Sequence, residues 1–184
     1  MMGERQDRST HEVLATRWVR DEDWCAWGEV DIRYPSGTVC KGLFRYVDRG
    51  GGVAIVPVDA QGNLVLVRHY RDTLGGYSVE IPRGKRHMGE SPEAAAERET
   101  AEELGCSTLS VERMGVVAPD DGFVCNVVPL VLVRVTGKMR ANEDEGITQM
   151  LVLSLDDVLD LIKDGEIVDS FTQAAALRML MREA

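Results

Sequence analysis

The sequence predicts a mixed α+β fold, built either as a mixed sheet with helices or as a layered α/β/α sandwich. Segments rich in β-branched residues and segments with helical character follow one another without a regular pattern. A strict alternation of strands and helices would instead indicate a doubly wound parallel sheet. The chain of 184 residues suits one domain with a modest extension.

The first fifty residues predict a small antiparallel sheet in front of the main domain. Residues 1–12 are polar and are expected to be frayed, and residues 35–37 (Pro-Ser-Gly) form a clear turn. The expected strands cover residues 13–18, 29–34 and 39–47. The glycine run that begins at Gly50 is a flexible joint. We therefore divide the chain into an extension, residues 1–50, and a main domain, residues 51–184.

The main domain is expected to contain six strands and three helices. The strands are predicted at residues 53–58, 64–70, 77–81, 108–117, 127–135 and 147–153. A turn is expected at Gly75-Gly76, and a loop at residues 119–122. Helices are predicted at residues 92–104, 155–163 and 171–182. We expect the last helix to have an apolar side made of Ala174, Leu177, Leu180 and Met181.

The helix at 92–104 has clear start and stop signals. Ser91 is a good N-cap, Pro92 suits the first helical position, and Gly105 is a natural residue just beyond the last turn. The alanines between them favour helix. These signals together predict a helix at about residues 92–104.

Three carboxylates fall on one side of this helix. Glu99, Glu102 and Glu103 lie within an arc of about 100°, where like charges three and four residues apart repel. A bound cation would offset that repulsion, and an all-oxygen ligand set suits Mg²⁺ or Mn²⁺. The simpler alternative is an acidic helix face that is exposed to water.

Composition narrows the classes of partner. The net charge of −10 argues against non-specific binding of nucleic acid and against anionic membrane surfaces. An anionic substrate would need a bound metal ion and local arginines. Four cysteines without a CxxC pair indicate reduced thiols in a cytoplasmic protein, and no apolar run suggests a signal peptide or a membrane span. The three histidines have no spacing typical of a zinc site.

The acidic helix is part of a longer pattern, G-x5-E-x7-R-E-x2-E-E-x-G. Its seven fixed positions are Gly84, Glu90, Arg98, Glu99, Glu102, Glu103 and Gly105. At average residue frequencies, a chance match in this chain has a probability of roughly one in a million. The pattern is that of the Nudix box, so the chain resembles the Nudix hydrolases. This resemblance implies a mixed sheet between helices, with the box as a loop–helix–loop.

The flanking residues are similar to the ADP-ribose pyrophosphatase branch of that family. Residues 67–71 (Val-Arg-His-Tyr-Arg) and 75–84 (Gly-Gly-Tyr-Ser-Val-Glu-Ile-Pro-Arg-Gly) match motifs of the branch. The resemblance implies Mg²⁺-dependent hydrolysis of ADP-ribose to AMP and ribose 5-phosphate, in a homodimer. Arg83 stands where the branch has alanine, and its guanidinium group could alter phosphate contacts. The loop at 119–122 also departs from the branch.

The resemblance assigns roles to the residues of the box. Glu99 and Glu103 would bind metal directly, and Glu102 would share the site as a ligand or in catalysis. The backbone carbonyl of Arg83 would be a further ligand. Gly84, Glu90, Arg98 and Gly105 would be structural, with Glu90 and Arg98 forming a charge pair that orients helix and loop.

Other roles lie outside the box. Glu143 or Glu145 would be the general base, with Asp144 as a rival in the same acidic loop. Arg71 would hold a phosphate, unless it is a surface arginine at a strand end. Glu80 would accept a hydrogen bond from the nucleobase or ribose, unless it faces solvent.

An aromatic residue of the extension would stack on the adenine, often from the partner subunit. Trp24 is the candidate and Trp27 its rival, and the alternative is a buried core tryptophan. Different functions also stay open: hydrolysis of GDP-mannose or another nucleotide sugar, removal of nucleoside triphosphates, or a non-catalytic nucleotide-sensing module.

Overall fold

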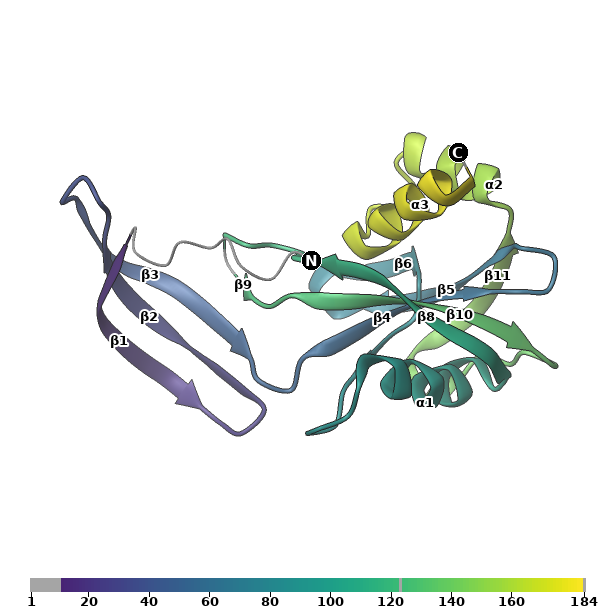
Figure 1. Cartoon of the computed structure of the whole chain (residues 1–184), viewed down its shortest axis with the longest axis horizontal. Helices are drawn as coiled ribbons and strands as arrows, with labels where there is room; N and C mark the ends of the chain where they lie inside the picture. Colours follow the sequence, from purple (N-terminus) through teal and green to yellow (C-terminus); the bar gives the residue numbers. More distant parts are fainter. Residues whose placement is uncertain (1–10, 123, 184) are drawn as a thin grey trace. The chain divides into compact units, whose positions relative to one another are not determined.

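The computed structural model describes residues 11–122 and 124–183. The expectation of a frayed stretch at 1–12 therefore falls almost entirely outside the described residues. The chain forms two compact units (Figure 1). Unit 1 comprises the chain up to Gly50 together with Asp120–Asn126, and unit 2 comprises Gly51–Pro119 and the chain from Val127 onward.

Unit 1 is a four-stranded sheet with the order β1-β2-β3-β9. Its strands are β1 (Glu12–Asp21), β2 (Cys25–Arg33), β3 (Val39–Asp48) and β9 (Val124–Cys125). The first three pair antiparallel, as predicted, and the turn between β2 and β3 uses Gly37 at a φ of 85°. β9 pairs parallel to β3 and was not predicted, because two residues give no periodic signal.

Unit 2 is built on a seven-stranded mixed sheet. The strands are β4 (Gly52–Val58), β5 (Leu64–Arg71), β6 (Gly76–Glu80), β7 (Arg83–Lys85), β8 (Ser107–Val117), β10 (Val128–Thr136) and β11 (Ile147–Leu153). The central order is β11-β5-β4-β10-β8, with β6 paired to β5 and β7 to β4. β10 and β4 are parallel, whereas the other pairs are antiparallel.

Helices cover both faces of this sheet (Figure 1). They are α1 (Pro92–Leu104), α2 (Leu155–Lys163) and α3 (Ser170–Glu183). Alternate residues of β4 point to opposite faces: Ala54 and Val56 pack in a core with α2 and α3, and Val53 and Ile55 pack in a core with α1. The predicted α+β fold, arranged as an α/β/α sandwich, is confirmed.

Most element boundaries agree with the sequence. The first two predicted helices and the strand at 147–153 have the expected bounds, and the other predicted strand ends are at most four residues from the observed ones. The glycine turn at 75–76 is different: Asp72–Leu74 form a 3₁₀ turn that Gly75 ends at a φ of 63°, and Gly76 already belongs to β6. No helix among the described residues is long and apolar enough to cross a membrane.

The predicted apolar side of α3 is wrong except at Ala174, which packs against the core. Leu177 and Met181 are 56% and 71% exposed, whereas Phe171, Ala175 and Ala176 are buried. Small side chains allow a helix to pack close to a sheet, so the alanines face the core although they are less apolar than leucine. The Asp169 carboxylate, 2.8 Å from the backbone nitrogen of Thr172, caps the first turn.

Candidate active site

Residues next to α1 determine where this helix begins and ends, and so where its acidic end lies. The Ser91 hydroxyl accepts a hydrogen bond from the Ala94 backbone nitrogen at 3.1 Å, and Gly105 ends the helix in the left-handed region at a φ of 63°. The thirteen residues between them form one uninterrupted helix. Its last two turns carry Glu99, Glu102 and Glu103.

β7 passes directly against Glu99. A Cβ atom added to Gly84 would lie 2.0 Å from the Glu99 carboxyl carbon, far closer than any real contact. β7 is held there by its pairing with β4, in which Gly84 lies opposite Val53. The glycine at this position therefore makes room for a carboxylate.

Glu99 and Glu103 are buried, although each is a glutamate. They are 8% and 3% exposed, and Oε2 of Glu103 has no hydrogen-bond partner among the described residues. Burial, followed by the negative charges of Glu99 and Glu145, raises the pKa of Glu103 to about 8. Burial also raises the pKa of Glu99, against the opposing effect of Arg98. A buried acidic group without a partner is costly unless something positive joins it.

Arg98 links the loop before α1 to the glutamates of the helix. Its guanidinium group donates to both carboxylate oxygens of Glu90 at 3.0 Å and to the Lys85 carbonyl at 2.7 Å. It also reaches Glu99 at 2.8 Å and Glu102 at 3.0 Å. The hydrogen bonds from Arg98 lower the pKa of Glu90 to about 2. This arginine thus holds the loop before α1 against the helix and leaves Glu102 half-exposed.

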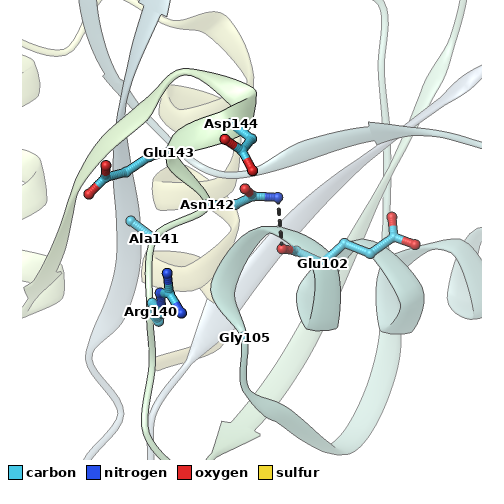
Figure 2. A pocket seen from close by; sticks show the side chains of 7 residues that line it. All are labelled: Glu102, Gly105, Arg140, Ala141, Asn142, Glu143 and Asp144. Carbon is cyan, nitrogen blue, oxygen red and sulfur yellow. Dashed lines mark hydrogen bonds between the residues drawn. The ribbon is translucent and has the colours of Figure 1, made fainter.

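The acidic loop, residues 138–146, docks onto the end of α1 (Figure 2). The backbone nitrogens of Arg140 and Asn142 donate to the carbonyls of Leu104 and Glu103, at 2.8 and 3.2 Å. The Asn142 side chain donates to the Glu102 carbonyl at 3.3 Å. These carbonyls belong to the last turn of a helix, where no intrahelical partner exists. Hydrogen bonds to these carbonyls therefore hold the loop against the end of α1.

Within that loop, Glu145 lies within electrostatic reach of both buried glutamates. Its charge acts on the pKa of both Glu99 and Glu103, and its Oε1 accepts a hydrogen bond from Asn142 Nδ2 at 3.1 Å. Glu143 and Asp144 line a cavity of about 400 Å³, whose other walls are Glu102, Gly105 and residues 140–142 (Figure 2).

A second, cationic cluster lies on β5, β6 and β7. Glu80 is 1% exposed, so the alternative of a solvent-facing residue is wrong. Its Oε1 accepts hydrogen bonds from Arg71 Nε and Arg83 Nη2, both at 3.0 Å, and from Arg71 Nη2. The pKa of Glu80 is lowered, since the two arginines outweigh the opposing effect of burial. The structure thus pairs Glu80 with arginines, where sequence reasoning expected it to meet the substrate.

The two tryptophan candidates belong to unit 1. Trp24 is 48% exposed, with the Arg20 guanidinium 5.9 Å from its ring centre, so it is not a buried core residue. Trp27 stacks on Phe44 with 6.1 Å between ring centres. The box residues belong to unit 2, so neither tryptophan shares a unit with them.

The chemistry of the carboxylates at the end of α1 and in the acidic loop suits a divalent cation. Among residues 11–122 and 124–183, no three His, Cys, Asp or Glu side chains already converge as a complete ligand set. Nevertheless, Glu99, Glu103 and Glu145 offer oxygen atoms only, repel one another, and include the unpartnered buried Oε2 of Glu103. Such a donor set matches hard ions.

Sequence reasoning missed three residues that shape the site. Asn142 links the acidic loop to α1, and Asp169 faces Arg83 with 3.5 Å between Oδ1 and Nη2. His69 bonds to the Glu145 backbone, next to Arg71. A signal existed for Asp169, an N-cap residue three positions before Thr172. The other two depend on tertiary contacts that have no local pattern.

Comparison with known proteins agrees with this geometry. The NUDIX domain profile matches residues 48–174. The chain is 29% identical over 157 residues to an ADP-ribose pyrophosphatase of Bacillus subtilis, and 32% identical over 158 residues to a methanol dehydrogenase activator of Bacillus methanolicus. Each alignment covers 84% of both chains.

A solved structure described as an ADP compounds hydrolase has the same fold. It superposes with a TM-score of 0.77 at 18% identity and covers 94% of this chain and 93% of its own. The buried glutamates, the arginine that orders them and the profile match over most of the chain lead to one conclusion: this chain belongs to the Nudix family and is a Nudix hydrolase.

Proposed function

We propose that this chain hydrolyses the diphosphate bond of a nucleoside diphosphate sugar, with ADP-ribose as the substrate and AMP and ribose 5-phosphate as the products. The observation that carries the proposal is the buried, unpartnered carboxylate oxygen of Glu103 beside Glu99 and Glu145. The similarity to a protein named ADP-ribose pyrophosphatase supports the choice of substrate.

Nudix hydrolases generally use divalent metal ions, and we propose Mg²⁺, with Mn²⁺ as a substitute. Glu99 and Glu103 would hold the ion, Glu102 would share the site, and the backbone carbonyl of Arg83 would add a ligand. When bound, the ion supplies positive charge that offsets the diphosphate and makes water more acidic. Arg98 meanwhile keeps Glu99 and Glu102 oriented.

Glu145 is the proposed general base. It would take a proton from the attacking water, whose oxygen forms a bond to one phosphorus while the bridging P–O bond breaks and the other phosphate leaves. The Asn142 contact to Glu145 holds this carboxylate near the buried glutamates. Glu143 and Asp144, on the cavity wall, would then be secondary to Glu145.

We further propose a homodimer in which unit 1 forms part of the interface. Several large apolar side chains of its sheet are exposed: Val13, Trp18, Val19, Tyr34, Leu43 and Phe44. A second copy would cover them, and Trp24 would stack on the nucleobase of the substrate. Light scattering at micromolar concentration tests this proposal, because it would give twice the monomer mass of 20.3 kDa.

The four cysteines are free thiols in the structure, which supports a reducing compartment, and we propose the cytoplasm.

The proposed reaction is tested by phosphate release in a phosphatase-coupled assay with Mg²⁺. The panel is ADP-ribose, ADP-glucose, GDP-mannose, diadenosine polyphosphates and deoxynucleoside triphosphates. A preference for ADP-ribose that EDTA abolishes is the expected result. Preference for another nucleotide sugar would contradict the substrate while keeping the chemistry. No turnover of any compound would contradict the reaction and favour a nucleotide-sensing role.

A further inference from the structure

Arg83 brings a second guanidinium group to the oxygen atom that already holds Arg71. Both arginines have a nitrogen 3.0 Å from Oε1 of Glu80. Two positive groups that converge on one oxygen repel each other. Asp169 compensates Arg83 only at 3.5 Å, and its other oxygen caps α3 through Thr172. The two carboxylates balance the two arginines in charge, and an anion between the guanidinium groups would relieve their mutual repulsion.

Each arginine retains hydrogen-bonding capacity. Among the described residues, the contacts of Arg71 use Nε and Nη2, and those of Arg83 use Nη2, so Nη1 of each is uncommitted. The two side chains are 27% and 28% exposed. The Phe171 ring lies against the Arg83 guanidinium group, with 4.9 Å between the ring centre and the guanidinium carbon. Hydrogen bonds to Glu80 also hold both guanidinium groups in place.

Arg71 and Glu80, which Arg83 contacts, lie within electrostatic reach of the carboxylates that would hold the metal ion. Arg83 itself precedes Gly84 in β7, and because successive strand side chains point to opposite faces, Arg83 meets Phe171 of α3 whereas position 84 faces Glu99. β7 and β6 both belong to the sheet that carries Arg71. In addition, Arg71 acts on the pKa of Glu103. A diphosphate bound at the acidic end of α1 would therefore have guanidinium groups within reach.

We propose that Arg83 is a substrate-binding residue which, together with Arg71, contacts the phosphate oxygens of a diphosphate-containing ligand. The proposal rests on the proposed function for the identity of that ligand. Arg83 makes and breaks no covalent bond, so its effect is on affinity. A guanidinium group suits this role because its planar fork matches phosphate oxygens.

The test compares wild-type protein with Arg83→Ala and Arg83→Lys. Arg113→Ala is the matched control, because Arg113 pairs with Glu93 at the opposite end of α1 and its loss changes the net charge equally. Binding of inorganic pyrophosphate and of ADP is measured by calorimetry in EDTA, so that metal plays no part. KM and kcat for ADP-ribose are measured separately, and melting temperature reports folding.

Loss of a charged hydrogen bond should weaken binding by about 10- to 100-fold. We expect Arg83→Ala to weaken pyrophosphate binding and raise KM by such a factor, with kcat within about threefold of wild type. Arg83→Lys should restore part of the affinity, and Arg113→Ala should match wild type. If Arg83→Ala does not fold, the affinity of Arg83→Lys for pyrophosphate tests the proposal instead, because lysine keeps the positive charge but lacks the planar guanidinium fork.

Unchanged pyrophosphate binding in a folded Arg83 variant would overturn the proposal, as would wild-type protein that binds no pyrophosphate in EDTA. An equal loss of affinity in Arg113→Ala would also overturn it, since overall charge would then be the cause. If wild-type protein hydrolyses no nucleotide sugar but shows Arg83-dependent pyrophosphate binding, the proposed function fails and the anion site stands.

Discussion

Replacing Gly84 with alanine should disable the site without unfolding the protein. The new Cβ would lie 2.0 Å from Cδ and 2.2 Å from Cγ of Glu99. Carbon atoms in contact are normally about 3.5–4.0 Å apart, so the carboxylate must move by about 1.5 Å or more. A displacement of about 1 Å in a catalytic group can cost about 100-fold in rate. We expect kcat to fall at least that far.

Stability should change little in the same variant. Gly84 is not in the left-handed region, so alanine meets no backbone strain there. Overpacking costs about 1–3 kcal/mol, and the loss of freedom in the unfolded chain offsets about 0.4–1 kcal/mol. We therefore expect a net loss of about 1–2 kcal/mol in the free energy of unfolding, measured by urea denaturation.

Gly76→Ala is the matched control for this experiment. Gly76 is also outside the left-handed region, and a Cβ atom there meets nothing within 4 Å. Its activity should equal that of wild type within about twofold. A folded Gly84→Ala protein with near-normal kcat would refute the reasoning, because Glu99 would then not need its present position.

Three further predictions concern the same site. In metal-free protein, burial raises the pKa of Glu103 from 4.5 to about 8, so the folded state binds a proton there more tightly than the unfolded chain does. The free energy of unfolding should therefore fall as pH rises from about 5 to 8, by at most about 5 kcal/mol, and urea titrations at several pH values measure it. Arg98→Ala should lower the free energy of unfolding by about 2–3 kcal/mol, because Glu90 and the buried Glu99 lose their cation. Asn142→Ala should reduce kcat about tenfold with little effect on melting temperature, because Glu145 loses its anchor.

Each of these has a control that separates the site from general effects. Glu103→Gln should flatten the pH dependence of stability, and an unchanged slope would contradict the assignment to Glu103. Arg182→Ala removes an exposed pair with Glu112 and should cost less than about 1 kcal/mol. For the loop, a rate loss in Asn142→Ala that comes only with unfolding would contradict an anchoring role.

The sequence predicted what depends on local chemistry. α1 was defined by Ser91, Pro92 and Gly105, which act within a few residues of their own position. The strands of the sheet followed from runs of β-branched residues, which pack well on a half-buried pleated surface. Such signals are contained in short windows, so no tertiary structure was needed to find them.

Features that depend on packing were not predictable in this way. The side of α3 that faces the core is set by the fit of Ala175 and Ala176 against the sheet, and large apolar residues such as Met181 remain outside. The partnership of Glu80 with Arg71 and Arg83 joins separate strands, so spacing along the chain gives no sign of it.

The measurement that tests the account most directly compares Glu103→Gln with Glu97→Gln in ADP-ribose hydrolysis. Glu97 lies on the exposed side of the same helix, so its variant controls for the loss of one carboxylate. We expect Glu103→Gln to lose at least about 1,000-fold in kcat at unchanged fold, and Glu97→Gln to match wild type in a reaction that EDTA stops. Near-normal turnover by folded Glu103→Gln would contradict the central claim that the buried carboxylates of α1 form the active site.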